Sequence, residues 1–228
     1  MIDRLISEIP RFFTASNVEF LVEAAGRTLL MSLVGCSIGF AFGFLLACLR
    51  RTRHPALLPA RLIAIGYVEI FRRIPFLVIL FLVLFGVQVA VPSASLFLIA
   101  LIGVCIVSTA FLAEIVRAGF DSVPRQQIEA AEVMNFGWFQ IIWMIVAPQA
   151  WKVILPPAFA FMVMFIKDTA LASQMGVVEL TFAGKILSNR GFSATLTFGV
   201  ILLAYFILSY PLTRLGRYLE KRLGASRN

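Results

Sequence analysis

The sequence has few of the side chains from which metal sites are built. It contains one histidine in 228 residues, His54, which stands in an arginine-rich segment without a second histidine or a carboxylate at ligand spacing. Because a zinc site takes three or four such ligands, the sequence predicts no metal site. The three cysteines, Cys36, Cys48 and Cys105, lie in apolar runs without paired spacing, and we expect them to behave as small apolar side chains.

Two further absences argue against an enzyme. No Ser/His/Asp or Cys/His constellation of the kind used in nucleophilic catalysis occurs. No segment matches G-x-x-x-x-G-K-[ST], the phosphate-binding loop of ATPases. We therefore expect that the chain binds no cofactor of its own and is not an enzyme.

Charge is scarce over long stretches. Only 14% of the residues are charged and 61% are hydrophobic, against roughly 25% and 45–50% in soluble domains. Since about 20 apolar residues cross the hydrocarbon core, this composition excludes a water-soluble globule and predicts an all-α membrane protein. The net charge is +8, but the basic residues do not form a stripe with interleaved aromatic residues. We therefore expect no nucleic-acid partner. Five segments carry no charged residue: Thr28–Leu49, Ile74–Ala113, Val133–Trp151, Val153–Ile166 and Gly191–Thr213.

Four membrane spans can be placed from these segments, and a fifth depends on the loops. The four cover about residues 28–49, 75–91, 94–113 and 194–213. Residues 133–166 hold either two spans or one, at about residues 149–167, preceded by an apolar segment outside the membrane core.

Loop charge decides between these alternatives, because lysine and arginine concentrate in short cytoplasmic loops. Six arginines lie within residues 50–73, and five basic residues lie in the tail, residues 214–228. Both regions are cytoplasmic only if residues 133–166 supply a single span. The sequence thus predicts five transmembrane helices with the N-terminal segment, residues 1–27, outside and the C-terminus inside. Residues 114–149 are then a cytoplasmic loop, and residues 167–193 face the other side.

Within that loop, residues 121–147 form an amphipathic segment. Pro124 is suited to the first turn of a helix, and Glu129-Ala130-Ala131 favours one. Asn135 or Gly137 can end this helix in the left-handed conformation, after which a second, apolar helix is expected to run to Pro148. Such a pair of helices suits the groove of a cytoplasmic protein partner.

These residues and their spacing resemble the permease subunits of bacterial ABC importers, specifically the polar amino-acid uptake group (histidine/glutamine/glutamate permease-like). The resemblance covers roughly residues 20–220 and is carried by five fragments in the family's order. They are G66-Y-V-E-I-F-R-R-I-P-F-L, T109-A-F-L-A-E-I-V-R-A-G with S122-V-P, E129-A-A with P148-Q-A, F165-I-K-D-T-A-L-A-S, and G176-V-V-E-L. It implies the type I ABC importer permease fold, with the transmembrane domain at residues 24–220.

The resemblance also implies a function and partners. The chain would form half of the translocation pathway for polar amino acids or related small compounds in the bacterial inner membrane. Two ATP-binding subunits would hold ATP and Mg, and a second permease subunit, identical or paralogous, and a periplasmic solute-binding protein would complete the system. Coupling to the ATPase would use the E-A-A loop: Pro124, Glu129, Ala130, Ala131, Asn135, Gly137 and Pro148.

The chain departs from the family at two points of this loop. Glycine is usual where Asn135 stands, but asparagine tolerates the left-handed conformation better than most residues. The second loop helix is usually basic, whereas Trp143 and Met144 occupy the commonly charged positions here. We therefore expect apolar docking of the partner at this helix.

Three sets of charged residues lie near the ends of predicted spans. Glu69 is three and four residues from Arg72 and Arg73, and Glu114 is three residues from Arg117, so both carboxylates are spaced for helical ion pairs. Ionisable groups at membrane depth are also often functional, so two interpretations stay open, structural ion pairs or contacts with a zwitterionic substrate. The candidate substrate-pathway residues are Glu69, Arg72, Glu114, Lys167, Asp168 and Thr169.

Two helix features in the spans have structural interpretations. Gly35, Gly39 and Gly43 recur every four residues and predict close helix packing. Pro156 and Pro157 remove backbone donors in the fourth span, and a kink there serves either packing or a substrate site.

Two rival functions make different demands on the sequence. A channel or secondary transporter working without ATP would need ionisable groups at mid-span, and the span centres are uncharged. A membrane enzyme would need a histidine or carboxylate cluster at one interface, which the lone His54 does not provide.

Overall fold

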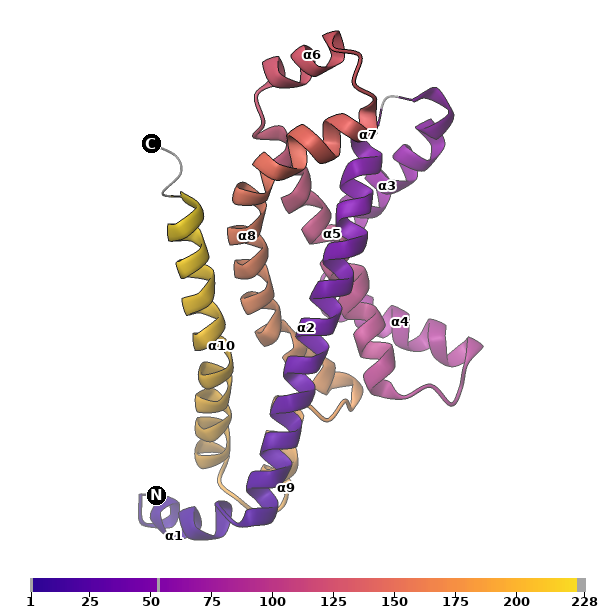
Figure 1. Ribbon diagram of the computed structural model, residues 1–228. Helices are drawn as coiled ribbons and strands as arrows, with labels where there is room; N and C mark the ends of the chain where they lie inside the picture. The colour runs from indigo at the N-terminus through magenta and orange to yellow at the C-terminus, as the bar shows by residue number, and fades with distance from the viewer. Residues whose placement is uncertain (1, 53, 225–228) are drawn as a thin grey trace. The chain divides into compact units, whose positions relative to one another are not determined.

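The computed structural model describes residues 2–52 and 54–224, and no strand occurs in these ranges. The all-α prediction is therefore confirmed, while Arg227 of the predicted basic tail lies outside the described residues. The elements, of which Figure 1 labels the α-helices, are α1 (Ile2–Phe12), α2 (Ala15–Arg51), η1 (Pro55–Leu57), α3 (Leu58–Phe71), α4 (Phe76–Ala90), α5 (Leu96–Asp121), α6 (Arg125–Val133), α7 (Trp138–Gln140), η2 (Ile141–Val146), α8 (Ala147–Asp168), η3 (Thr169–Met175), α9 (Leu180–Asn189) and α10 (Ala194–Gly224).

Four of the described helices are long and apolar enough to cross a membrane. They are α2, α5, most of α10, and the continuous helix Trp138–Met175 that includes α7, η2, α8 and η3. A fifth span arises only if η1 and α3 are taken together with α4. Helix α4 alone, which corresponds to the predicted span 75–91, has 15 residues, fewer than the roughly 20 that cross the hydrocarbon core.

Two of the spanning helices extend well beyond the charge-free segments. Helix α2 begins at Ala15 rather than near Thr28, and a Glu23–Arg27 pair of 2.6 Å supports its added turns. Helix α5 runs on to Asp121, so the predicted loop that starts at Glu114 is helical over its first residues. A charged residue ends an apolar run but does not end a helix, because pairs three or four residues apart stabilise it.

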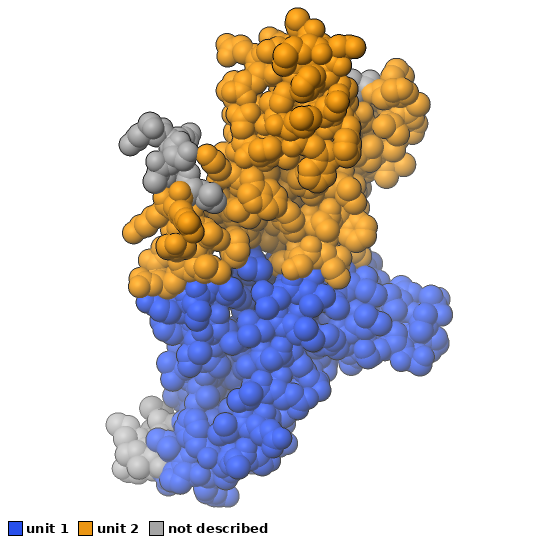
Figure 2. All heavy atoms as spheres, viewed as in Figure 1, with its two compact units in different colours: residues 1–35, 76–104, 162–212 blue, residues 36–75, 105–161, 213–228 orange. Residues whose placement is uncertain are grey.

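The chain divides into two compact units, which Figure 2 shows in different colours. Unit 1 comprises residues 1–35, 76–104 and 162–212, and unit 2 comprises residues 36–75, 105–161 and 213–228. In unit 1, helix α9 packs on the first halves of α2 and α10 through the buried side chains of Ala24, Leu180, Ala183 and Ile201.

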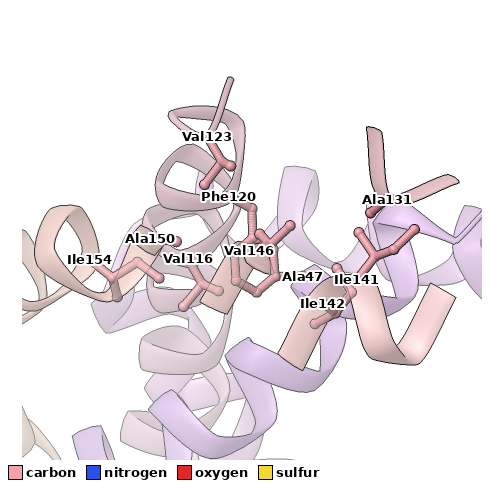
Figure 3. Close-up of a cluster of buried hydrophobic side chains, with 10 residues drawn as sticks. All are labelled: Ala47, Val116, Phe120, Val123, Ala131, Ile141, Ile142, Val146, Ala150 and Ile154. Atoms are coloured by element: carbon pink, nitrogen blue, oxygen red, sulfur yellow. The ribbon is translucent and has the colours of Figure 1, made fainter. Parts of the chain in front are cut away.

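The core of unit 2 joins α6 to the helices that precede and follow it (Figure 3). Apart from Ala47 on α2 and Ala131 on α6, its buried side chains belong to α5 or the turn after it and to the helix from η2 into α8. They are Ala47, Val116, Phe120, Val123, Ala131, Ile141, Ile142, Val146, Ala150 and Ile154. Because Ala131 is fully buried in this core, α6 is held against the membrane-spanning helices and is not a free loop.

The predicted packing role of the glycines is confirmed. In unit 2, a Cβ added at Gly39 would lie 2.1 Å from Ser108 Oγ, and one at Gly43 would lie 2.7 Å from the backbone nitrogen of Ala113. In unit 1, a Cβ at Gly35 would lie 2.3 Å from Val104 Cγ1. Helices α2 and α5 therefore approach each other too closely for any larger side chain at these positions.

Gly43→Ala is expected to destabilise the protein by about 3 kcal/mol, the upper part of the range for overpacking, because the new methyl group meets backbone atoms that cannot rotate away. The measurement is denaturant unfolding of the purified protein in detergent micelles. Gly26→Ala on the same helix is the matched control, since no atom lies within 4 Å of its added Cβ. Equal stability of the two variants would contradict the prediction.

Candidate functional site

Helix α6 carries three of the predicted coupling residues, Glu129, Ala130 and Ala131. It begins at Arg125, directly after Pro124, whose extended backbone (φ −56°, ψ 132°) occupies the N-cap position. Ala131 is buried, whereas Glu129 and Ala130 are exposed. Among the described residues, Glu129 forms no hydrogen bond or ion pair. The helix therefore presents an unpaired carboxylate to its surroundings while its other face packs on unit 2.

The turn after α6 ends the helix as predicted, with Asn135 in the left-handed conformation at φ 61°. The N–H of Phe136 donates to the carbonyl of Ala131 (3.0 Å), and the N–H of Asn135 donates to the carbonyl of Glu132 (2.9 Å). These two bonds make a Schellman motif. Gly137 has ordinary extended backbone, and its N–H donates to Oε1 of Gln140 at 2.8 Å, at the start of α7.

Asn135→Ala is expected to cost about 1 kcal/mol of unfolding free energy, because an alanine Cβ is strained in the left-handed region. Asn135→Gly should leave stability unchanged or raise it slightly, since glycine adopts this conformation freely. Hydrogen exchange of the α6 amides would report the local effect. If the α6 amides exchange as slowly in the alanine variant as in the glycine variant, the left-handed conformation of Asn135 does not limit stability and the prediction is wrong.

The second helix of the loop does not end at Pro148. A continuous helix runs from Trp138 to Met175, with a π-helical stretch at Ile141–Val146 in which the N–H of Ala147 donates to the carbonyl of Ile142. Proline removes a donor and crowds the preceding turn of an α-helix. The wider π turn just before Pro148 accommodates that ring, so the helix enters the α8 segment without a break.

Five large apolar side chains are exposed at the end of α6 and on the helix that follows it. They are Val133, Met134, Phe139, Trp143 and Met144, and we term them the exposed apolar residues. Val133 is 88% exposed, and the other four side chains are more than half exposed. All five lie in the segment that the sequence assigns to the cytoplasm, and the apolar docking of a protein partner at these side chains stays a prediction.

A cluster of arginines surrounds Glu114, which we term the Glu114 cluster. The Glu114 carboxylate accepts from Arg50 Nη1 at 3.0 Å, pairs with Arg117 on its own helix, and lies 3.5 Å from Arg72 Nη1. Asp121 extends the cluster through Arg117 and Arg51. The Glu114 cluster therefore ties the ends of α2, α3 and α5 together within unit 2.

The remaining substrate-pathway candidates do not join this cluster. Glu69 pairs with Arg73 rather than Arg72, at 2.6 Å on an exposed surface. Lys167 is exposed at the end of α8 in unit 1, followed by the half-buried Asp168. The buried hydroxyl of Thr169 donates to the carbonyl of Ile166.

One buried carboxylate was not predicted from the sequence. Glu179, at the N-cap of α9, has no exposed surface; its carboxylate accepts from the N–H of Phe182 and the hydroxyl of Tyr205, both at 2.7 Å. Burial raises the pKa of the Glu179 carboxyl above its usual value, although the hydrogen bonds oppose this. The N-cap spacing to Phe182 was visible in the sequence, but the partner Tyr205 belongs to another helix.

The chain matches the family model described as binding-protein-dependent transport system inner membrane component over residues 39–225. Among named proteins, it is 30% identical over 218 residues to the probable glutamine ABC transporter permease protein GlnP of Bacillus subtilis, covering 92% of this chain and 96% of that protein. It is also 30% identical over 206 residues to the inner membrane amino-acid ABC transporter permease protein YhdY of Escherichia coli, covering 88% of this chain and 55% of that protein.

Solved structures give the same fold. A crystal structure of an amino acid ABC transporter with histidines superposes with a TM-score of 0.81 at 25% identity, over 91% of this chain and 95% of that chain. An inward-facing structure of the MetNI methionine ABC transporter gives a TM-score of 0.80 at 24% identity, over 92% and 99%.

Proposed function

Because the chain belongs to the family of binding-protein-dependent transport system inner membrane components, we propose that it forms one half of the translocation pathway of an ATP-driven amino-acid importer. The chain is a multi-pass membrane protein and a permease, the non-catalytic transport subunit of an ABC importer, which requires an ATPase partner. We further propose its substrate class, its partners and the contact through which the ATPase is coupled to it.

The observation that supports the coupling contact best is the unpaired Glu129, followed along the chain by the exposed apolar residues. Helix α6 is short, ends in a well-formed Schellman motif and is fixed to the unit 2 core through Ala131. Closure of the two proposed ATPase subunits would therefore move α6 as a rigid body with the helices packed on it. Asn135, Gly137 and the π-helical stretch before Pro148 would maintain the geometry of this rigid body.

The proposed orientation places α6 and the basic C-terminal segment in the cytoplasm and the N-terminus outside. It is supported by the six arginines of residues 50–73 and by the cluster of basic residues at the end of α10. A periplasmic solute-binding protein would then meet the opposite face, in the bacterial inner membrane, and a second permease, identical or paralogous, would complete the pathway.

The proposed substrates are polar amino acids or related small compounds, in line with the glutamine and amino-acid names of the relatives. Lys167 and Asp168 are the better candidates for contact with an ammonium and a carboxylate, since neither side chain forms a hydrogen bond or close ion pair with another described residue. The Glu114 carboxylate is already occupied by three arginines, so we assign it a structural role.

Reconstitution in liposomes tests the proposal. The chain, its neighbouring ATPase and the binding protein are expected to take up radiolabelled glutamine only when ATP is enclosed with the ATPase. Lys167→Ala and Asp168→Ala should lower uptake, while Lys221→Ala, a loss of charge at an exposed position near the end of α10, serves as the control. Uptake of the same size without ATPase would favour a channel or secondary transporter and contradict the proposal.

A further inference from the structure

A cavity of about 910 Å³ lies within unit 2, beside α6. Its walls come from the end of α2, the short segment before α3, α3 itself, the end of α5, α6, and the α7–η2 helix. Glu129 of the proposed coupling contact is one of the lining residues, but neither that contact nor the proposed substrate pathway accounts for the arginines and apolar side chains that line most of the cavity.

The polar wall of the cavity is rich in arginine. Arg50, Arg51, Arg61, Arg117 and Arg125 line it, against three carboxylates. Arg50, Arg51 and Arg117 are paired with Glu114 or Asp121 in the Glu114 cluster. Arg61 and Arg125 form no hydrogen bond or ion pair among the described residues, and neither do the lining carboxylates Glu129 and Glu132. Because five arginines stand against three carboxylates, the lining keeps an excess of positive charge that an anion can balance.

The other wall is apolar. Ile65 on α3, Ile128 on α6, and Phe136 and Trp138 around the turn into α7 line it, next to the unit 2 core residues Ile141 and Ile142 drawn in Figure 3. A free inorganic anion would contact the arginines and leave this apolar surface in water. A ligand with both an anionic group and an apolar chain would match both walls.

The position of the cavity along the chain agrees with such a ligand. The charge-free run of α2 ends at Leu49, and the cavity is lined by Ala47, Arg50, Arg51, Thr52 and His54. It therefore lies where the apolar span gives way to the basic side of the protein. Basic pockets at this level bind the head groups of acidic lipids, since the cytoplasmic leaflet carries negative charge.

We propose that this cavity binds an anionic phospholipid, with its phosphate on Arg61 and Arg125 and the start of an acyl chain along Ile65, Ile128 and Trp138. An acidic peptide of a partner protein would satisfy the arginines but not the apolar wall. Because Ile128 belongs to α6, an occupied cavity supports α6 against α3, which makes coupling dependent on lipid. This inference rests on the proposed orientation, which puts the cavity on the cytoplasmic side, and not on the substrate or on the identity of the ATPase.

Native mass spectrometry of the purified full chain tests the site without the ATPase. Phosphatidylglycerol and phosphatidylcholine are titrated separately into the protein in detergent. The Arg61→Gln/Arg125→Gln variant is expected to bind phosphatidylglycerol roughly 10- to 30-fold more weakly, because each basic residue contributes about 1 kcal/mol to an acidic lipid. The Arg217→Gln/Lys221→Gln variant removes the same charge from exposed positions on α10 and should bind as the unmodified protein does.

A second variant keeps the test informative if the arginine variant does not fold. Ile65→Trp fills the apolar side of the cavity without removing charge, and it should also weaken phosphatidylglycerol binding. Equal binding of phosphatidylcholine, or no loss in either cavity variant, would overturn the proposal. Displacement of the lipid by an equal concentration of glycerol phosphate would show a free-phosphate site instead, and displacement by an acidic peptide would show a peptide site.

Discussion

Glu129→Lys is expected to reduce substrate-stimulated ATP hydrolysis of the reconstituted importer to its unstimulated level. Glu129 is exposed and unpaired in this chain, so its carboxylate is free to meet a basic group on the ATPase. Reversing its charge replaces attraction by repulsion at the docking surface, and losses of this kind at interfaces commonly exceed tenfold in affinity. The measurement is phosphate release with and without loaded binding protein.

The matched control for this variant is Glu220→Lys, an equal charge reversal at an exposed position on α10. Both variants should insert into the membrane and elute as folded protein, because neither side chain takes part in the buried cores. Stimulated hydrolysis that survives Glu129→Lys at full rate would show that the ATPase docks elsewhere. Co-purification of the ATPase would separate lost docking from lost stimulation.

Glu114→Gln is expected to destabilise the protein by about 3 kcal/mol, the lower part of the range for breaking a buried ion pair. Glutamine has the shape of glutamate, but it leaves the charges of Arg50, Arg72 and Arg117 without their shared carboxylate. The lower figure applies because the Arg72 and Arg117 side chains keep 35% and 40% of their surface exposed. Thermal unfolding in detergent micelles measures the effect.

Glu69→Gln separates this cluster from an ordinary surface pair. Its partner Arg73 is 78% exposed, and exposed ion pairs contribute little to stability. We expect no measurable change in unfolding temperature for this control. If Glu114→Gln were equally harmless, the Glu114 carboxylate would be free for another role, and substrate contact would regain support.

The parts of the structure that the sequence predicted well are those fixed by neighbouring residues. Pro124 and the left-handed Asn135 bound helix α6 because their own backbone preferences act within one turn. The apolar character of the next helix was equally visible, and Trp143 and Met144 are exposed on it.

The features that could not be predicted from the sequence depend on contacts between residues far apart in the sequence, or on ion pairs between residues of one helix. Helix α5 continues to Asp121 because Arg117 pairs with carboxylates on both sides of it, while the prediction ended the span where charge begins. The three-arginine surroundings of Glu114 draw on α2 and α3. Likewise, the Glu179–Tyr205 bond joins residues of two helices, and a single sequence carries no signal for such a contact.

The π-helical stretch has a consequence for the angular phase of the helix that contains it. Buried side chains recur every four residues along it, at Ile142, Val146, Ala150 and Ile154. In a uniform α-helix such a row would drift by about 40° at each step, because successive residues are about 100° apart. A π-helical turn holds more residues than an α-helical turn, so successive residues are less than 100° apart and the drift is reversed over that turn. The stretch at Ile141–Val146 thus offsets part of the drift of the following α-helical turns, so that Ile142 and Val146 in η2 and Ala150 and Ile154 in α8 all reach the same core.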